Sequence, residues 1–282
     1  MAELINPLNI YRYKRKNKCF NEHLADGVTL TLMLIPAGEF LMGAPESEPE
    51  SRDNERPQHW VRVQQFLMGC YPVTQAQWRA VARYQQIEQE LNPEPSEFKG
   101  DNRPVEQVSW KDATEFCKRL SHNTGREYKL PSEAQWEYAC RAGTKTPFHF
   151  GEIITTDLAN YNGNSTYNGS PQGKYREQTT DVGIFPANVW GLHDLHGNVW
   201  EWCLDDWHDN YEGAPKDGGA WFDDNVNLEE KQSRTVVRGG SWVNIPRLSR
   251  SAYRGNFGRR VFIIDSVGFR VCCTTPKNIL NT

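Results

Sequence analysis

The sequence predicts a single domain of the α+β class whose C-terminal half is rich in loops. Three observations support this prediction. Residues 28–68 contain short runs in which apolar and polar residues alternate, as they do in half-buried strands. Residues 74–143 contain three signals for the start of a helix. From residue 144 onward the chain is rich in Gly, Asn, Tyr and Trp, and no linker separates the two halves.

The first 68 residues predict an extension followed by strands. Residues 1–27 lack clear periodicity, and we expect an N-terminal extension that packs onto the domain or is partly mobile. The domain proper is expected over 28–282. Strands are predicted to begin within 28–36 and 39–43, and 59–68 is again strand-like. The polar and acidic residues between them, 44–57, predict an exposed loop.

Three helices are predicted from their capping residues. A Ser or Thr is followed three residues later by Gln or Asp at Thr74 and Gln77, Ser109 and Asp112, and Ser132 and Gln135. In this pattern the hydroxyl and the later side chain each bond a free backbone N–H at the helix start. We expect the third helix to end before Gly143, where a left-handed cap fits.

Composition narrows the function classes. The formal net charge of -4 argues against nucleic acid or an anionic membrane as a partner. No apolar stretch predicts a signal peptide or membrane span. The seven cysteines are odd in number and scattered, and no Cys-x-x-Cys pair occurs. They are interpreted mainly as buried thiols of a reducing compartment, so we expect a cytoplasmic protein.

One tract has an unusual composition. Residues 243–266 contain many apolar residues and five arginines but no Glu, Lys, Gln, Met or Trp. These five types form about a fifth of the chain, so about five would be expected in such a window. Their joint absence by chance is roughly a one-in-several-hundred event. The absence therefore requires a cause.

With these landmarks the chain resembles the formylglycine-generating enzyme family, also called the sulfatase-modifying factor family. The motifs that carry the resemblance are 35–43, 72–74 with Trp78, 104–110, 130–139, 191–202 and the segment from Arg238 to Arg270. They occur in the order of the family and cover the chain from about residue 28 onward. The resemblance implies a variant of the C-type lectin fold. Because one fold can serve several functions, the site requires a separate argument.

The resemblance gives little support to an enzyme. Catalytic members oxidise a substrate cysteine with a copper-binding pair of their own cysteines, because soft Cu(I) requires thiolate ligands. Those positions fall on Asn244 and Ser249, so no copper is expected. Cys272 and Cys273 follow the last motif and are interpreted as core residues of a terminal strand.

A histidine metal site is also not favoured. Related iron-dependent sulfoxide synthases use a separate helical domain, which this chain lacks. His193 and His196 lie three residues apart, but His196 occupies a position where the family often has a histidine in a turn. A structural role is the favoured interpretation for both.

A sub-branch of the same fold offers a cause for the unusual tract. It comprises the variable proteins of diversity-generating retroelements, in which an error-prone copy of a template repeat replaces the end of the gene. Randomising the adenines of Asn codons such as AAC leaves codons of the type NNY, which never encode Glu, Lys, Gln, Met or Trp. Those are the types missing from 243–266.

The resemblance therefore implies a diversified binding surface. Its expected variable, ligand-contacting residues are Val243, Asn244, Ile245, Arg247, Leu248, Tyr253, Gly255, Asn256, Phe257, Val261, Phe262, Ile263, Ile264, Asp265 and Ser266. The expected fixed frame includes Pro246, 250–252 and Arg254, whereas Ser249 could vary as well. The ligand is unknown, but a broad surface of apolar and Arg side chains suits a protein better than a small molecule.

Alternatives remain open at this point. The apolar run 261–264 could be a buried strand, although the frame favours exposed contacts. The chain could be a divergent oxidase of the parent family. It could also be a structural or signalling adaptor whose tract packs in an oligomer.

The resemblance also implies a structural calcium ion. Residues 194–201 match a calcium loop of the family, in which Asp194 and Glu201 would supply side-chain oxygens and Gly197 and Val199 main-chain oxygens. A second site would involve Asn160, whose partners cannot be named from the sequence. Either ion would stiffen loops near the binding face and take no part in chemistry.

Overall fold

The structure is a computed structural model, and it describes residues 11, 13–223, 234–258 and 263–274. Five strands form the largest sheet, in the order β1-β2-β5-β11-β6. Their bounds are β1 Cys19–Ala25, β2 Val28–Ile35, β5 Phe66–Gly69, β11 Cys272–Thr274 and β6 Tyr128–Lys129. All the pairs are antiparallel. The C-terminal β11 therefore lies between strands from the first half of the chain.

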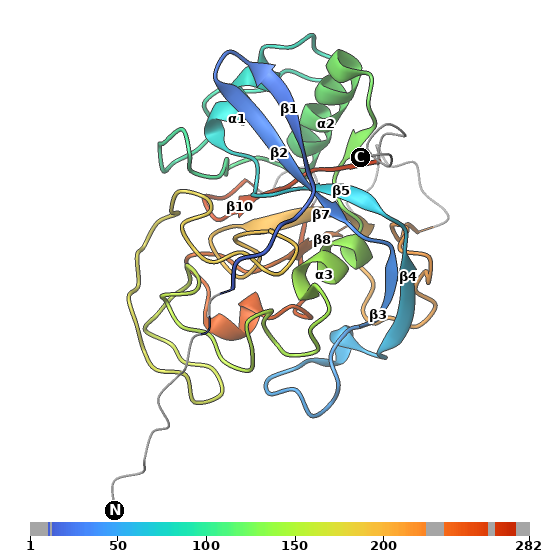
Figure 1. Ribbon diagram of the computed structural model, residues 1–282, viewed down its shortest axis with the longest axis vertical. Coiled ribbons are helices and arrows are strands. Elements are labelled where there is room, and N and C mark those ends of the chain that lie inside the picture. The colour runs from blue at the N-terminus through green and yellow to red at the C-terminus, as the bar shows by residue number, and fades with distance from the viewer. Residues whose placement is uncertain (1–10, 12, 224–233, 259–262, 275–282) are drawn as a thin grey trace, which may run out of the picture.

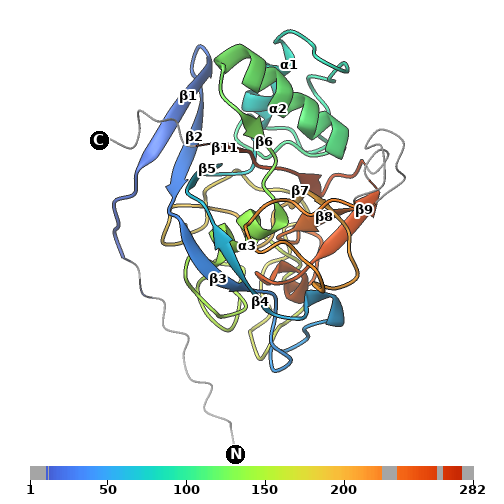
Figure 2. The same cartoon turned by 90° about the vertical axis from the view of Figure 1, so that its right-hand side faces the viewer.

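A four-stranded sheet carries the second half of the chain, in the order β10-β7-β8-β9. These strands are β10 Val267–Gly268, β7 Trp200–Asp206, β8 Arg234–Arg238 and β9 Gly255–Gly258. β10 pairs with β7 in parallel, and the other pairs are antiparallel. A separate two-stranded sheet joins β3 Gly38–Met42 to β4 His59–Val63. Figure 2 shows β1 and β9 on opposite sides of the molecule.

Three α-helices complete the described part of the fold: α1 Gln75–Ala82, α2 Trp110–Thr124 and α3 Glu133–Arg141. Short 3-10 turns lie at Asp53–Glu55 and Pro246–Ser249. In Figure 1, α1 and α2 lie beside the β1–β2 hairpin, whereas α3 lies near β3 and β4. Among the described helices, none is long and apolar enough to cross a membrane.

All three predicted helix starts are confirmed. The hydroxyl of Thr74, Ser109 or Ser132 accepts a hydrogen bond from the backbone N–H three residues on, and a capping box forms each time. The third helix ends at a left-handed Ala142, followed by Gly143, which is also left-handed. The cap therefore occupies two residues, one more than the sequence predicted.

Two adjoining apolar clusters form most of the core. One contains Trp78, Phe116 and Phe269 in mutual ring contact between α1, α2 and the C-terminal segment. The other surrounds Trp136 of α3 and includes Cys272, while Cys273 belongs to the first. The prediction that Cys272 and Cys273 are core residues of a terminal strand is confirmed.

Two assignments in the first 68 residues need correction. Residues 19–25, assigned to the extension, form the edge strand β1. The alternation was hidden because Glu22 fills an inward position, where it bonds Arg126 and the hydroxyl of Tyr128. The single run predicted over 59–68 is two strands, β4 and β5, which belong to different sheets.

Candidate functional site

Four buried arginines hold the segment from Arg238 to Arg270 onto the scaffold; we call Arg238, Arg250, Arg254 and Arg270 the frame arginines. None is more than 1% exposed. Each forms an ion pair with a buried glutamate: Arg238 with Glu137, Arg250 with Glu55, Arg254 with Glu133 and Arg270 with Glu201. A buried charge is tolerated only when it is paired and hydrogen-bonded. These positions therefore cannot vary freely.

The partners of the frame arginines come from distant parts of the chain. Glu133 and Glu137 lie on α3, and Glu201 lies on β7. Arg254 makes a bidentate pair with Glu133 at 2.6 and 2.9 Å. The guanidinium of Arg238 also donates to the backbone oxygens of residues 251–253. Hydrogen bonds from the buried Arg238 side chain thus hold the backbone of residues 251–253 in place.

Arg250 corrects the interpretation of residues 44–57. Its guanidinium donates to both oxygens of Glu55, at 2.6 and 2.8 Å, and to Glu48 at 2.5 Å. Glu48 and Glu55 are buried, so part of this loop is not exposed as predicted. Its acidic composition reflects in part the need to balance a buried cation from a segment some 200 residues away.

Three of the predicted variable residues expose apolar side chains, and we call Val243, Ile263 and Ile264 the apolar patch. They are 38%, 55% and 37% exposed. The segments that carry them are joined by a hydrogen bond of 3.1 Å from the indole N–H of Trp242 to the main-chain oxygen of Asp265. Ile263 and Ile264 therefore do not form a buried strand. Val261 and Phe262 lie outside the described residues.

Other predicted variable residues are half-buried. They are Asn244, Ile245, Arg247, Leu248, Gly255, Asn256, Phe257 and Asp265. Leu248 and Phe257 pack against the core, and the Phe257 ring contacts Trp200 and Trp202 edge-on. A Cβ atom at Gly255 would meet a methyl of Val237 at 2.9 Å. These contacts restrict which side chains each position can accept.

Two predicted variable residues are buried, contrary to the expectation of exposed contacts. Tyr253 is 7% exposed and Ser266 is 3% exposed. The Tyr253 ring lies beside Trp200 and the guanidinium groups of Arg52 and Arg250. The main-chain oxygen of Ser266 accepts a hydrogen bond from the backbone of Trp200. Both residues were expected to be exposed because they lie in the 243–266 tract, but the composition of a tract does not show which side chains point inward.

Scaffold residues that sequence reasoning missed border the apolar patch. Phe98 meets the Trp242 ring edge-on at 5.3 Å, and Tyr175 stacks on it at 6.4 Å. The backbone N–H of Gln107 donates to the main-chain oxygen of Ile264 at 3.1 Å. The residues near 98 and 175 lie in loops far from the tract in sequence. No motif or spacing could have placed them beside it.

Asn244 and Ser249 are the residues onto which the family resemblance places the catalytic cysteine pair. The Asn244 side-chain oxygen accepts a hydrogen bond of 2.6 Å from the Ser241 hydroxyl. Ser249 is buried, and its hydroxyl has no partner among the described residues. Neither side chain supplies the soft thiolate that Cu(I) requires.

The predicted calcium loop is tightly bent. Asp194, Gly197 and Asn198 all have positive φ angles. A Cβ atom at Gly197 would meet the main-chain oxygen of Asn160 at 2.2 Å, so only glycine fits. Gly197 and Asn198 donate their N–H groups to Gly239 and Asn160. The loop therefore joins the 160 region to the start of the Arg238–Arg270 segment.

The chemistry of this loop suits a hard cation. Asp194 is buried, and its Oδ1 atom has no partner among the described residues, whereas its Oδ2 accepts from Gly183. Burial raises the pKa of Asp194 to about 6. Glu201 is already bound by Arg270 and the Trp136 indole, but a carboxylate has further lone pairs. A divalent ion beside Asp194 and Glu201 would satisfy the unpartnered oxygen, so these residues fit calcium.

The histidines and buried thiols play structural roles. His196 donates through Nδ1 to the Ser249 main-chain oxygen at 2.7 Å and accepts the His149 backbone N–H at 3.1 Å. Burial lowers its pKa to about 4, so it is neutral at pH 7. His193 bonds the Phe185 main-chain oxygen. Burial also raises the pKa of Cys140 to about 12, which keeps it a thiol.

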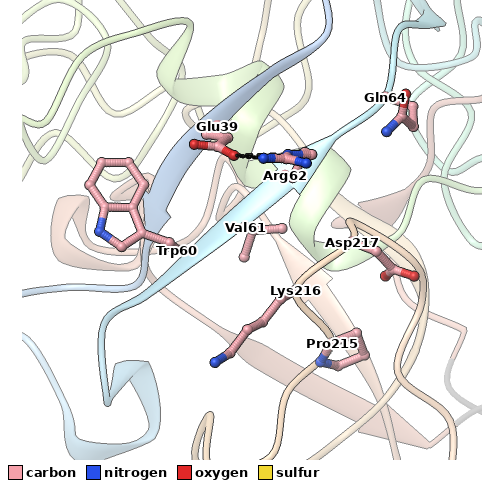
Figure 3. Close-up of a pocket in the computed structure, with 8 residues that line it drawn as sticks. All are labelled: Glu39, Trp60, Val61, Arg62, Gln64, Pro215, Lys216 and Asp217. Carbon is pink, nitrogen blue, oxygen red and sulfur yellow. Dashed lines mark hydrogen bonds and ion pairs between the residues drawn. The ribbon is translucent and has the colours of Figure 1, made fainter.

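A surface hollow of about 560 Å³ lies between β3, β4 and residues 215–217 (Figure 3). Trp60 stands at one side of it, and an exposed ion pair of 2.6 Å joins Glu39 to Arg62. None of the described residues of the 243–266 tract lines this hollow. It is thus a separate feature from the apolar patch.

Solved structures of similar fold support the architecture. PvdO from Pseudomonas aeruginosa is 31% identical, with a TM-score of 0.77 over 93% of this chain and 100% of that chain. Treponema denticola variable protein 1 is 24% identical, with a TM-score of 0.69 over 91% of this chain and 99% of that one. The expected loop-rich C-type lectin-like fold is confirmed.

Sequence relatives include both an enzyme and an inactive protein. Formylglycine-generating enzyme of Mus musculus is 29% identical over 230 residues, which cover 64% of this chain and 59% of that protein. Inactive C-alpha-formylglycine-generating enzyme 2 of Bos taurus is 26% identical over 273 residues, which cover 77% and 85%. Residues 22–275 match the sulfatase-modifying factor enzyme 1-like domain. The chain therefore belongs to this family of formylglycine-generating-enzyme-like proteins.

Proposed function

We propose that the chain is a non-catalytic ligand-binding protein of the retroelement-diversified type, which displays residues 243–266 as its binding surface. The observation that carries this proposal is the composition of that tract. Its missing residue types are those that NNY codons cannot encode. The proposed partner is a protein, because the exposed side chains are apolar and spread over a surface.

The division of the tract into anchored and displayed residues supports the proposal. The frame arginines hold fixed positions by buried ion pairs, whereas the apolar patch contributes little to the core. A diversified surface requires a rigid scaffold and exposed variable positions. Treponema denticola variable protein 1 has this fold, although at 24% identity the likeness extends to the fold alone.

A divergent oxidase is the second candidate, and family membership favours it. The chain would then need another ligand set, because Asn244 and Ser249 stand at the cysteine positions. Incubation of the purified chain with Cu(I), oxygen and a cysteine-containing peptide separates the candidates. We expect no peptide-dependent oxygen consumption. Turnover that depends on bound copper would favour the oxidase.

The decisive experiment for the proposal is to sequence the DNA downstream of the gene. We expect a near-copy of the segment encoding Arg238 to Arg270, differing almost only at adenines and close to a reverse-transcriptase gene. The variable codons should include those of the apolar patch and should exclude those of the frame arginines. A downstream region without such a repeat would contradict the proposal, and residues 243–266 would then be interpreted as an ordinary loop.

We also propose a structural calcium ion held by Asp194 and Glu201 with the main-chain oxygens of Gly197 and Val199. The unpartnered Oδ1 of buried Asp194 supports it. The ion would stabilise the loop that touches Gly239, and hence the start of the binding segment.

A further inference from the structure

We propose that the partner places a cationic side chain, of arginine or lysine, against an acidic border of the apolar patch formed by Asp265 and Glu97. This inference rests on the proposed function and specifies the chemistry that this variant recognises. Of the two acids, Asp265 belongs to the proposed variable tract, whereas Glu97 lies in the scaffold.

The border is built from two segments in contact. Ile264 and Asp265 are held by hydrogen bonds to the backbone of Gln107 and the indole of Trp242, both 3.1 Å long. Phe98, the residue after Glu97, lies edge-on against the same indole. The acidic side chains therefore lie beside exposed Ile264, on a surface that also contains the half-buried Tyr175 ring.

The acids at this border repel one another. Glu106 lies behind them and is fully buried, with its carboxylate accepting the N–H groups of Glu97 and Phe98. Burial raises its pKa to about 7, and the charges of Asp265 and Glu97 add to the effect. Burial and the Glu97 charge likewise raise the pKa of Asp265. Within the described residues, no Lys or Arg forms an ion pair with Asp265 or Glu97.

Among the described residues, a cation is the group that this surface lacks. It would relieve the repulsion between the acids, and the half-buried Tyr175 ring would attract it further. The aliphatic stem of an arginine or lysine would at the same time cover the apolar patch. An uncharged or acidic surface would bury Asp265 without a partner of opposite charge, which is costly. Charge complementarity thus favours a basic protein segment over a neutral one.

The cation site can be tested without knowing the partner. N-acetylarginine amide is titrated into the full chain while the indole N–H signal of Trp242 is followed by NMR, with N-acetylcitrulline amide as the uncharged control. We expect a saturable shift with the arginine compound only, at concentrations on the order of millimolar. It should be lost in Asp265→Asn and kept in Glu90→Gln, which removes an exposed acid elsewhere. Equal shifts with both compounds, or none, would overturn the inference.

The link to the proposed function is tested with a displayed library of small proteins selected against the full chain. Binders weakened by Ile264→Ser and Val243→Ser define use of the apolar patch. We expect these binders to carry a basic anchor and to lose about tenfold or more in affinity with Asp265→Asn and Glu97→Gln. Patch-dependent binders indifferent to both substitutions would overturn the inference but leave the proposed function standing. Failure to obtain any patch-dependent binder would instead count against the proposed function.

Discussion

At the scale of single residues, charge burial separates the positions of the tract that should tolerate substitution from those that should not. Each frame arginine was removed from water together with a glutamate from another segment. Such a pair adds little net stability compared with apolar residues, yet losing one partner leaves the other charge buried alone. Both partners of each ion pair must therefore be kept for the backbone to hold this conformation.

The Arg250–Glu55 pair gives a direct test. Glu55→Gln should lower the free energy of unfolding by about 1.5–3 kcal/mol, because Arg250 loses its bidentate partner in the interior but keeps its ion pair with Glu48. Glu39→Gln breaks the exposed pair with Arg62 and should cost about 0–1 kcal/mol. Urea unfolding measures both. Equal costs for the two variants would contradict the assignment of Arg250 as an anchor.

Glu106 predicts a pH effect of defined sign. Burial raises its folded-state pKa to about 7, well above the value of an unfolded glutamate, so the folded chain binds the extra proton between roughly pH 4.5 and 7. The stabilisation of the folded chain that comes from this proton is fully present below the pKa of Glu106 in the unfolded chain. It is lost as the pH rises from there through the folded-state pKa of about 7. Glu106→Gln stays neutral, so its stability relative to the parent should increase from pH 5 to pH 8.

Thermal unfolding at several pH values measures this effect, with Glu97→Gln as the comparison. Because Gln can replace only one of the two backbone contacts, Glu106→Gln will be less stable than the parent at low pH. The informative quantity is therefore the slope of the difference with pH. A difference that is constant from pH 5 to 8 would contradict the raised pKa.

At the scale of elements, exposed and buried residues follow one another closely along the tract. The turn at Val243 and the segment at Ile263 lie at the surface, whereas Tyr253 lies between them in the sequence but inside the protein. Substitution tolerance should follow this geometry and not the codon pattern alone.

Asparagine scanning checks the expected tolerance. Val243→Asn and Ile263→Asn should each change the free energy of unfolding by less than about 0.5 kcal/mol, as is usual at exposed positions. Tyr253→Asn should cost about 3–5 kcal/mol, because it removes a buried ring from its contacts with Trp200 and two arginines. A harmless Tyr253→Asn would show that this position is free to diversify after all.

Local signals predicted local structure well. The helix caps at Thr74, Ser109 and Ser132 fixed three helix starts because capping depends on residues three apart. Strand β1 was missed because a buried Glu22 interrupts its apolar side. The partners of such an acid, Arg126 and Tyr128, come from distant sequence, so no local pattern reveals them.

The candidate site was predictable in location but not in detail. The composition of 243–266 marked the tract, and exposed Val243, Ile263 and Ile264 agree with a displayed surface. Composition carries no information on side-chain direction. Tyr253 and Ser266 therefore could not be distinguished from exposed neighbours. The same limit hid the scaffold residues around Trp242, which meet it only in the folded chain.

At the scale of the whole molecule, the C-terminal segment closes the fold. β11 lies inside the five-stranded sheet, between β5 and β6 (Figure 2). Arg270, which precedes β11, pairs with Glu201 of the other sheet. The segment from Arg238 to Arg270 is therefore held at both ends by strands and in its middle by buried residues 250–254, while Val243, Ile263 and Ile264 reach the surface. This arrangement couples the stability of the display region to that of the entire domain, because the two ends can be released only when the sheets open.

The proposed calcium ion provides a test at this scale. An ion that binds only the folded chain stabilises it by about 2.7 kcal/mol when its free concentration is about 100 times its dissociation constant. The melting temperature should thus be higher in CaCl₂ than in EDTA. Asp194→Asn should remove most of this difference, whereas Asp181→Asn, at an exposed position, should keep it. Because the pKa of Asp194 is raised to about 6, protons should compete with calcium, and the difference should shrink below that pH. Identical melting curves in calcium and EDTA at pH 7.5 would exclude a stabilising ion and leave Asp194 as a buried acid held by Gly183 alone.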